Sequence, residues 1–410
     1  MRGSLLIGQS GGPTSVINSS LAGAIVAGIN SDKIDNVYGA LNGIAGIINH
    51  QIIDLKKESA ETIELLKTTP GSILGSVRYK LKDFKIDDTD YKVLKNVFES
   101  LNIKYFIYIG GNDSMDTCNK INEYFKSINF DCKVFGVPKT VDNDLVETDH
   151  TPGYGSSIKY IATCIAEIYQ DISCYAKGKV TIVEIMGRDA GWLTAGSKLA
   201  CLTNNGPDLI YLPETAFDLE DFLLKVKNIY DKKQHALVAV SEGIKDKDGK
   251  YILEYNTSGN ADAFGHVQLG GVAQVLATFV KEKLNLPNRS IELNLPQRCS
   301  SHISSLTDIE EAFNCGYKAV EFMLNGNSGK MVSMVRINSD SYEIEYHAKD
   351  LINIANEVKE VPSKYIIDNG SNISDEFIKY ALPLILNEPN TKYENGMPKF
   401  AKLEKHYIKF

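Results

Sequence analysis

Short apolar runs that end in glycine or in polar clusters alternate along the chain with segments of helical periodicity. In one such segment Ile158, Ile161 and Ile165 repeat at intervals of three and four residues, which predicts an amphipathic helix over residues 156–173. Strands and helices that alternate in this way are typical of parallel α/β sheets. We predict strands at residues 4–8, 104–109, 133–137, 180–186, 236–240 and 289–295, and further helices at residues 16–29 and 272–280.

These elements favour an α/β fold of two doubly wound lobes with a ligand site in the cleft between them. A chain of 410 residues has room for two large domains or for two to three domains of roughly 150 residues each. Beyond about residue 340 the pattern weakens, and it predicts no domain boundary there.

The composition is that of an ordinary globular protein, with 43% apolar and 23% charged residues, which excludes wholesale disorder. A formal net charge of −8 is unsuited to coating nucleic acid or an anionic membrane, so we expect neither as a partner. A cationic site for a phosphorylated substrate must therefore be local and built from a few arginines and lysines.

The seven cysteines are widely spread and form no CxxC pair, which argues against a disulfide framework and against a structural zinc site. The apolar run near the N-terminus covers only residues 5–7, which is too short for a signal-peptide core or a membrane span. We therefore expect buried free thiols and a soluble protein of the cytoplasm.

Glycine pairs follow the first two predicted strands. Residues 7–18 read IGQSGGPTSVIN and residues 109–117 read IGGNDSMDT. Ligands bind beyond the carboxyl ends of strands in open α/β sheets, and paired glycines let the backbone approach a ligand closely. Neither turn is GxGxxG or GxxxxGK[ST], so a nicotinamide-dependent dehydrogenase and a Walker A loop lack support. Either turn, taken alone, is also compatible with simple steric packing.

The third strand end, residues 136–145 (GVPKTVDNDL), concentrates ionisable groups in a short segment. If this segment is extended, Asp142 and Asp144 lie on the same side and both face the cleft. One carboxylate would then act as a general base while the other orients it or holds magnesium. Lys139 would offset charge on a transferring phosphoryl group. For this segment alone, an Asp/Asn turn without a catalytic role is the alternative.

Eight short motifs in order along the chain carry a resemblance to a known family. They read SGG (10–12), LGSVRY (74–79), GGND (110–113), PKTVDND (138–144), TPGYGS (151–156), MGRDAGWL (186–193), SEG (241–243) and PQR (296–298). The set resembles the phosphofructokinase A family over roughly residues 4–325. The resemblance implies a phosphofructokinase-like fold and phosphorylation of the 1-hydroxyl of fructose 6-phosphate in glycolysis. It assigns residues 1–150, completed by part of 297–345, to donor binding and residues 151–296 to the sugar phosphate, and it leaves residues 346–410 unplaced.

Two positions distinguish the phosphoryl donors of this family. ATP-dependent members typically read GGDGS and PGTIDND, whereas pyrophosphate-dependent members read GGDDS and PKTIDGD. This chain has Asp113 and Lys139 where ATP-dependent members keep glycine. A carboxylate at residue 113 adds bulk and negative charge in the path of a nucleotide, and a lysine at residue 139 can neutralise the transferred phosphate. Both residues favour pyrophosphate, in a reversible reaction.

The resemblance also implies roles for individual residues, with Asp142 as the general base and Mg²⁺ as the cofactor. The expected catalytic residues are Asp142, Lys139, Thr140, Asp144 and Arg188, and the expected donor-binding residues are Gly11, Gly12, Arg78, Gly111, Asp113 and Ser114. The expected fructose-phosphate-binding residues are Thr140, Asp142, Lys179, Met186, Gly187, Arg188, Glu242, Arg289 and Arg298, and the expected metal ligands are Asn112 and Asp113.

Three residues depart from the family pattern. Asn112 replaces an aspartate and keeps an oxygen ligand without its charge, and Leu295 stands where histidine or tyrosine is frequent. Lys179 replaces an arginine that binds the 6-phosphate with help from a neighbouring subunit, and it keeps the charge without the bidentate fork. We expect a homodimer or homotetramer, in which Arg289 reaches a neighbouring site. The alternatives are an ATP-dependent phosphofructokinase and a catalytically silent regulatory subunit that binds sugar phosphate.

Overall fold

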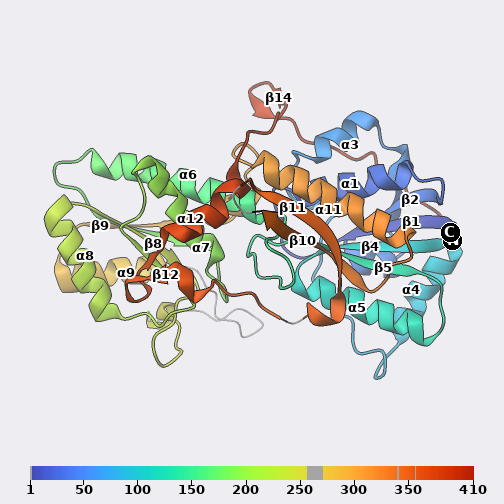
Figure 1. Cartoon of the computed structure of the whole chain (residues 1–410), viewed down its shortest axis with the longest axis horizontal. Coiled ribbons are helices and arrows are strands. Elements are labelled where there is room, and N and C mark those ends of the chain that lie inside the picture. Colours follow the sequence, from blue (N-terminus) through green and yellow to red (C-terminus); the bar gives the residue numbers. More distant parts are fainter. Residues whose placement is uncertain (1, 256–270, 339–340, 356) are drawn as a thin grey trace.

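Two β-sheets, each covered by helices on both faces, form two lobes that lie side by side (Figure 1). The computed structural model describes residues 2–255, 271–338, 341–355 and 357–410. The larger sheet has the strand order β11-β10-β5-β4-β1-β2-β3, and only β3 and β11 are antiparallel to their neighbours. Its strands are β1 (Gly3–Gln9), β2 (Ile34–Ala40), β3 (Ile52–Asp54), β4 (Ile103–Gly110), β5 (Lys133–Pro138), β10 (Lys330–Asn338) and β11 (Glu343–Asp350).

The central strands of the larger sheet are buried on both faces because helices pack above and below them. On one face α1 and α11 approach so closely that a Cβ atom on Gly23 would lie within 2 Å of the carbonyl oxygen of Phe313, at 1.9 Å. Only glycine permits this contact. The helices of this lobe are α1 (Ile17–Ile29), α2 (Gly43–Ile48), α3 (Ala60–Leu66), α4 (Thr89–Ser100), α5 (Asn112–Ser127) and α11 (Leu306–Leu324).

The smaller sheet is entirely parallel and has the strand order β7-β8-β6-β9. Two hydrophobic clusters, one on each face, join it to its helices. Its strands are β6 (Val180–Ile185), β7 (Leu209–Tyr211), β8 (Ala236–Ser241) and β9 (Asn288–Glu292). Its helices are α6 (Tyr154–Ser173), α7 (Trp192–Gly196), α8 (Leu219–Lys233), α9 (Val272–Phe279), α10 (Pro296–Cys299) and α12 (Asp375–Ala381).

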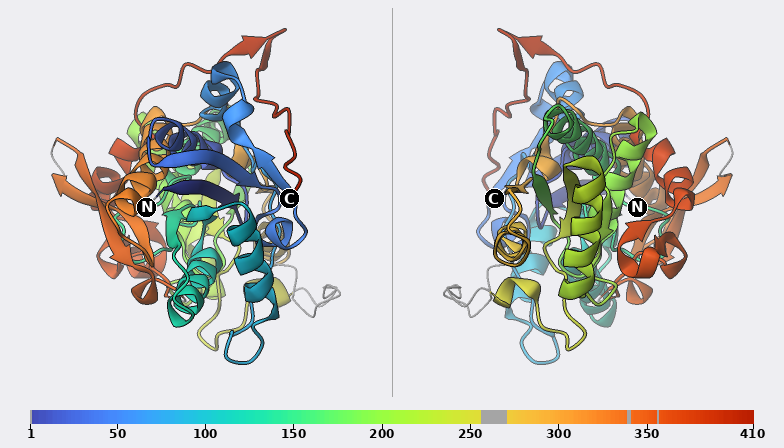
Figure 2. Two further views of the ribbon diagram at one scale, coloured as in Figure 1. Left: turned by 90° about the vertical axis from the view of Figure 1, so that its right-hand side faces the viewer. Right: turned by 90° about the vertical axis from the view of Figure 1, so that its left-hand side faces the viewer.

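The last sixty residues, which carry no recognisable motif, cross between the lobes twice. After β11 the chain passes to the smaller lobe, where it forms β12 (Ile366–Ile367), β13 (Asn372–Ile373) and α12. It then returns through the projecting hairpin of β14 (Tyr393–Glu394) and β15 (Met397–Pro398), seen at the top of Figure 2. The final residues lie against β3, where Ile408 donates its backbone N–H to Ile52.

A buried ionic cluster fixes the loop that follows β5. His150 lies between Asp149 and Glu311, with ring nitrogens 2.9 and 2.7 Å from their carboxylate oxygens. Burial alone would lower the pKa of His150, but Glu311 and Asp149 together raise it to about 9. The guanidinium of Arg336 on β10 binds the same carboxylate of Asp149 at 2.8 Å. The loop is therefore tied to both β10 and α11 of the larger lobe.

All the strands and helices predicted from the pattern are present, with ends shifted by a few residues. The largest difference is at β9, which ends at Glu292 rather than at residue 295 because the chain turns into α10. The pattern did not predict β10 and β11, and β2, β3 and β7 were also missed. All seven cysteines are free, as expected, but only Cys118, Cys132 and Cys315 are buried, whereas Cys164, Cys201 and Cys299 are partly buried and Cys174 is exposed.

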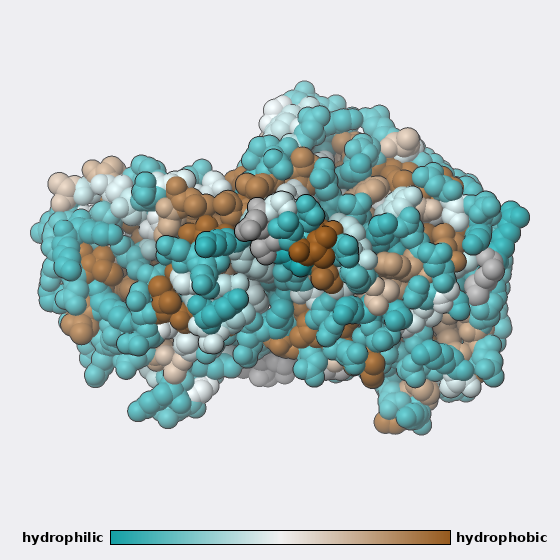
Figure 3. All heavy atoms as spheres, in the orientation of Figure 1, coloured by the Kyte–Doolittle hydropathy of each residue, from teal (hydrophilic) through white to brown (hydrophobic). Residues whose placement is uncertain are grey.

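The described part of the face in Figure 3 agrees with the picture drawn from composition. The face seen in Figure 3 is mostly hydrophilic, and its apolar residues occur in small scattered groups. Within the described ranges, none of the helices has the length and apolar character that a bilayer crossing requires.

Candidate active site

A cleft of about 650 Å³ opens at the carboxyl ends of β1, β4 and β5. This is the edge at which the sequence motifs were expected to converge, because the three strands are neighbours and parallel. The cleft is lined by Ser10, Gly11, Gly12, Val77, Arg78, Tyr79, Lys80, Gly111, Asn112, Asp113, Ser114, Asp116, Thr117, Lys139, Thr140, Asp142, Asp144 and Val358. It therefore brings together every expected donor-binding residue and four of the five expected catalytic residues.

The glycine turn after β1 forms a cradle around a buried lysine. Gly11 has φ of +78°, and a Cβ atom there would lie 3.1 Å from the ammonium of Lys139. That ammonium donates a hydrogen bond of 2.8 Å to the carbonyl of Gly12. Burial lowers the pKa of Lys139 to about 8, although the charges of Asp142 and Asp144 oppose this effect. The floor of the cleft thus holds a desolvated cation next to the exposed backbone of a glycine turn.

The two carboxylates of the third motif both line the cleft, but the predicted reason is wrong. Asn143 lies between them with φ of +55°, so the segment is a left-handed turn and is not extended. Asn143 is fully buried, and its side-chain amide donates to the hydroxyl of Tyr380 at 2.9 Å. The turn, held by this asparagine, is what aims Asp142 and Asp144 at the same space.

The environment of the two acids differs. The Thr140 hydroxyl donates to Asp142 at 3.2 Å, and the backbone N–H of Asp142 donates back to that hydroxyl at 3.1 Å. Burial raises the pKa of Asp142, against the effects of Thr140 and Lys139. Burial and the neighbouring charge of Asp142 raise the pKa of Asp144 to about 6. Oδ1 of Asp144 is buried and has no hydrogen-bond partner among the described residues, so it is available to a ligand.

The start of α5 forms a further part of the cleft wall, next to the glycine turn. Asp113 is exposed there and Ser114 is buried, and Gly111 precedes the helix. The amide of Asn112 donates to the backbone carbonyl of Glu357 at 2.5 Å. The N-terminus of a sixteen-residue helix favours an anion, and this one opens into the cleft.

The expected acceptor residues follow the carboxyl ends of β6 and β8 in the other lobe. Glu242 accepts the backbone N–H of Gly187 at 3.2 Å, and the hydroxyl of Ser241 donates to the carbonyl of Gly187 at 2.6 Å. Burial raises the pKa of Glu242, and the charge of Asp142 raises it further while Arg188 opposes it. The charges of Asp142 and Glu242, which come from opposite lobes, therefore act on each other.

Arg298 was expected to bind the fructose phosphate, but it lies close to the glycine turn after β1. A Cβ atom on Gly12 would lie 3.4 Å from a terminal nitrogen of Arg298, and the arginine's charge acts on both Lys139 and Asp142. Its Nε is buried and has no hydrogen-bond partner among the described residues. Arg298 therefore lies beside the glycine turn, and its charge reaches the two ionisable residues Lys139 and Asp142.

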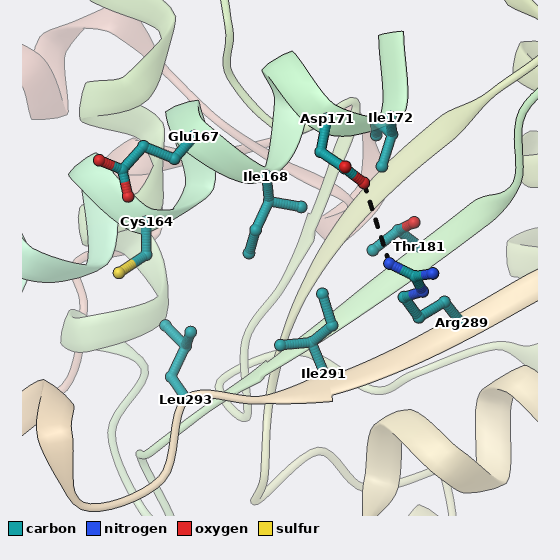
Figure 4. Close-up of a pocket in the computed structure, with 9 residues that line it drawn as sticks. All are labelled: Cys164, Glu167, Ile168, Asp171, Ile172, Thr181, Arg289, Ile291 and Leu293. Atoms are coloured by element: carbon teal, nitrogen blue, oxygen red, sulfur yellow. Dashed lines mark ion pairs between the residues drawn. The ribbon is translucent and has the colours of Figure 1, made fainter. Parts of the chain in front are cut away.

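Lys179 and Arg289 are not brought to this cleft. In the register of β6 and β9, Thr181 pairs with Arg289, whereas Met186 stands five residues further along. At about 3.3 Å per residue, Arg289 is roughly 16 Å from the acceptor end of its own lobe. Figure 4 shows Arg289 pointing instead into a shallow pocket of about 390 Å³, where its guanidinium lies 3.8 Å from the carboxylate of Asp171.

Several residues of the site were not predicted as site residues: Ser10, Val77, Tyr79, Lys80, Asp116, Thr117 and Val358 in the cleft lining, and Gln297. Gln297 is buried, and its side-chain carbonyl accepts the N–H of Met186 at 3.2 Å. It is the middle residue of the PQR motif, which could have pointed to it. Val358 lines the cleft from the C-terminal segment, where no motif or periodicity marks it. Its place depends on contacts between residues far apart in the sequence, which a local pattern does not encode.

Comparison with known proteins agrees with this geometry. A model of the phosphofructokinase family matches residues 4–323. The chain belongs to the phosphofructokinase family. It is 41% identical to the pyrophosphate–fructose 6-phosphate 1-phosphotransferase of Halomonas elongata, over 98% of this chain and 96% of that protein. It is 39% identical to the enzyme of the same name from Xanthomonas campestris, over 98% and 96%.

A solved structure extends the likeness to the whole fold, including the C-terminal segment that the family model does not cover. The crystal structure of a pyrophosphate-dependent phosphofructokinase from Nitrosospira multiformis superimposes with a TM-score of 0.91 at 36% sequence identity. The superposition covers 100% of this chain and 98% of that chain. The predicted family resemblance and fold class are thereby confirmed.

Proposed function

We propose that this protein transfers a phosphoryl group between pyrophosphate and the 1-hydroxyl of fructose 6-phosphate, giving fructose 1,6-bisphosphate and phosphate. The observation that carries the choice of donor is the buried ammonium of Lys139, 2.8 Å from the carbonyl of Gly12 in the glycine turn. A cation there neutralises the phosphate that is transferred. The names of the similar enzymes from Halomonas and Xanthomonas support the same reaction.

The proposed mechanism needs positioning and charge neutralisation, which are the main requirements of phosphoryl transfer. Asp142 takes the proton of the 1-hydroxyl while that oxygen bonds to a phosphorus of pyrophosphate. The bond from this phosphorus to the bridging oxygen breaks, and phosphate leaves. Thr140 fixes the carboxylate of Asp142 through its hydroxyl, and Lys139 and Arg298 supply positive charge around the transferred group. We propose that the larger lobe binds the donor and the smaller lobe the acceptor.

The chemistry of the cleft fits Mg²⁺. Mg²⁺ is usually held by one or two carboxylates together with phosphate oxygens and water. Asp144 offers a buried oxygen without a partner among the described residues, and Asp113 stands exposed in the lining of the same cleft. In the same ranges no cluster of three or more His, Cys, Asp or Glu side chains is placed to hold a metal. We propose Asp144 and Asp113 as ligands, with Asn112 in a supporting place, and the ion would supply further positive charge to pyrophosphate.

The first test concerns the donor. We expect the parent protein to turn over fructose 6-phosphate with pyrophosphate and not with ATP. Asp113→Gly removes the bulk and charge that oppose a nucleotide, and we expect it to raise the ratio of ATP-driven to pyrophosphate-driven turnover by about tenfold or more. Asp113→Asn keeps the bulk without the charge and separates the two effects. A parent that prefers ATP, or that is inactive with both donors, would contradict the proposed function.

The second test concerns the 6-phosphate of the sugar. Because Arg289 is remote from the cleft of its own chain and half exposed (51%), we propose that it enters the site of a second copy in a homodimer or homotetramer. We expect Arg289→Ala to raise KM for fructose 6-phosphate about 10–100-fold with little change in kcat, since this phosphate keeps its charge during the reaction. Lys179 belongs to the same cationic edge.

Mixing two impaired chains, assayed at fructose 6-phosphate well below the raised KM of Arg289→Ala, tests the exchange of residues directly. One chain carries Arg289→Ala and the other carries Asp142→Asn. In randomly assembled dimers, about a quarter of all sites would combine an intact Asp142 with an intact Arg289 from the partner, so activity should return on mixing. If mixing restores nothing, Arg289 does not act across subunits.

We also propose a reducing compartment such as the cytoplasm, which the seven free thiols support.

A further inference from the structure

A short strap, residues 357–361 of the C-terminal segment, runs along the cleft between the two lobes. It lies beyond the region matched by the family model, which ends at residue 323. Val358 lines the cleft, and the residues on either side of it make hydrogen bonds to loops of both lobes. The strap therefore belongs to the neighbourhood of the reacting groups, although no sequence motif marks it.

Lys359 is the centre of this strap. Its ammonium donates to the backbone carbonyls of Thr148 and Asp149 at 3.1 and 3.0 Å. It also donates to the side-chain carbonyl of Asn143 at 3.3 Å. Asn143 is the left-handed residue that aims the two acids, so Lys359 holds the turn from behind. These three hydrogen bonds fix the accepting carbonyl groups relative to one another, because each carbonyl must point toward the same ammonium.

The backbone of the same residue joins the lobes. The N–H of Lys359 donates to the carbonyl of Asp144 at 2.8 Å, on the donor side of the cleft. Its carbonyl accepts the indole N–H of Trp192 at 2.7 Å, at the start of α7 in the smaller lobe. The ammonium also lies 5.3 Å from the centre of the Trp192 ring. One residue thus bonds directly to the loop of the base and to the loop that follows Arg188.

Two other residues of the strap, Glu357 and Val361, also make hydrogen bonds to residues near the cleft. The carbonyl of Glu357 accepts the amide of Asn112 at the start of α5. The N–H of Val361 donates to Glu214 at 3.0 Å, and the same carboxylate oxygen accepts the N–H of Gly191 at 2.8 Å. The loops that carry the donor wall, the acids and the acceptor residues are all held by five consecutive residues.

We propose that Lys359 is a positioning residue of the phosphotransfer reaction. Through Asn143 and Asp144 it fixes the acid-bearing turn, and through Trp192 it fixes that turn relative to the acceptor loops of the other lobe. It touches neither substrate. This inference rests on the proposed function, because it assumes that base and acceptor come from opposite sides of the cleft.

Lys359→Met removes the ammonium and keeps the length of the side chain. We expect kcat to fall about 10–100-fold while KM for pyrophosphate and for fructose 6-phosphate changes less than about threefold, since small displacements cost alignment more than binding. Trp192 is the only tryptophan of the chain and is almost fully buried, so its fluorescence reports on the strap. We expect a red shift of its emission and stronger quenching by acrylamide.

Three further variants separate positioning from general loss of stability. Lys225→Met is the matched control, because the ammonium of Lys225 also holds the C-terminal segment, through the carbonyl of Asp368 and the hydroxyl of Ser371, away from the cleft. It should leave kcat and the tryptophan emission unchanged. Lys359→Arg keeps the charge and should restore part of kcat. Trp192→Phe removes the indole donor together with part of a ring that packs against Tyr154, Phe377 and Tyr380, and it should lower kcat about 3–10-fold with the same KM values.

The possible outcomes distinguish a failure of the proposed function from a failure of the positioning role of Lys359. A parent that is inactive with pyrophosphate and fructose 6-phosphate contradicts the proposed function itself. An active parent with normal kcat in Lys359→Met, or with equal losses in Lys225→Met, overturns the positioning role alone. If Lys359→Met does not fold, Trp192→Phe decides, and a normal kcat in that variant overturns the proposal.

Discussion

Asp142→Asn is expected to lower kcat by about 10²–10⁴, the usual contribution of a general base, with substrate binding and fold retained. The amide matches the carboxylate in shape and can keep the contact with the Thr140 hydroxyl, 3.2 Å away in the parent. It cannot take a proton from the 1-hydroxyl. Steady-state kinetics with pyrophosphate, together with a thermal melt, measure the loss of chemistry and the retention of structure separately.

The control for this experiment is Asp189→Asn. Asp189 is exposed, and its charge acts on Asp142 from the acceptor side of the cleft. Its neutralisation removes one nearby negative charge without removing the base, so kcat should change less than about threefold. Asp144 is unable to replace Asp142 easily, because base geometry tolerates little displacement. Near-normal kcat in Asp142→Asn would exclude Asp142 as the base.

Much of this fold and site could be predicted because parallel α/β architecture is locally encoded. Each buried strand is a short apolar run and each strand end carries the polar residues of one motif, so the motifs of β1, β4 and β5 were bound to meet at one edge. The cleft confirms that convergence. The assignment of each residue to a role remains a prediction, because geometry alone does not identify the donor or the base.

Other features depended on contacts that a local pattern does not contain. The orientation of Asp142 and Asp144 comes from the left-handed Asn143, and its conformation is held by Tyr380 and Lys359 from the C-terminal segment. A strand of alternating side chains and a turn both place two acids on one side, so the spacing alone could not separate them. The strap could not be predicted for the same reason, since its residues act through partners more than 140 positions away in the sequence.

Lys139→Met is expected to reduce pyrophosphate-driven kcat by about 10²–10³-fold, because the cation that neutralises the transferred phosphate is lost. The thermal stability of the variant should not fall together with its activity. Burial lowers the pKa of Lys139 to about 8 in the folded protein from an ordinary 10.5, so at neutral pH its charge opposes folding by roughly 3 kcal/mol. This cost is present at pH values below about 8 and disappears as the pH rises toward 10.5. Replacing the ammonium by an apolar chain removes the cost, although it also removes the hydrogen bond to Gly12.

Tm of Lys139→Met at pH 7 should therefore equal or exceed that of the parent while turnover collapses, and the advantage should shrink at pH 10. Lys139→Arg keeps a charge in the cradle and should retain more activity than the methionine variant. Differential scanning calorimetry at both pH values and kinetics with pyrophosphate provide the two measurements. A large fall in Tm that accompanies the loss of activity would show that Lys139 holds the glycine turn together. A functional cation kept at the expense of stability predicts the opposite result, a Tm that is retained or raised while turnover is lost.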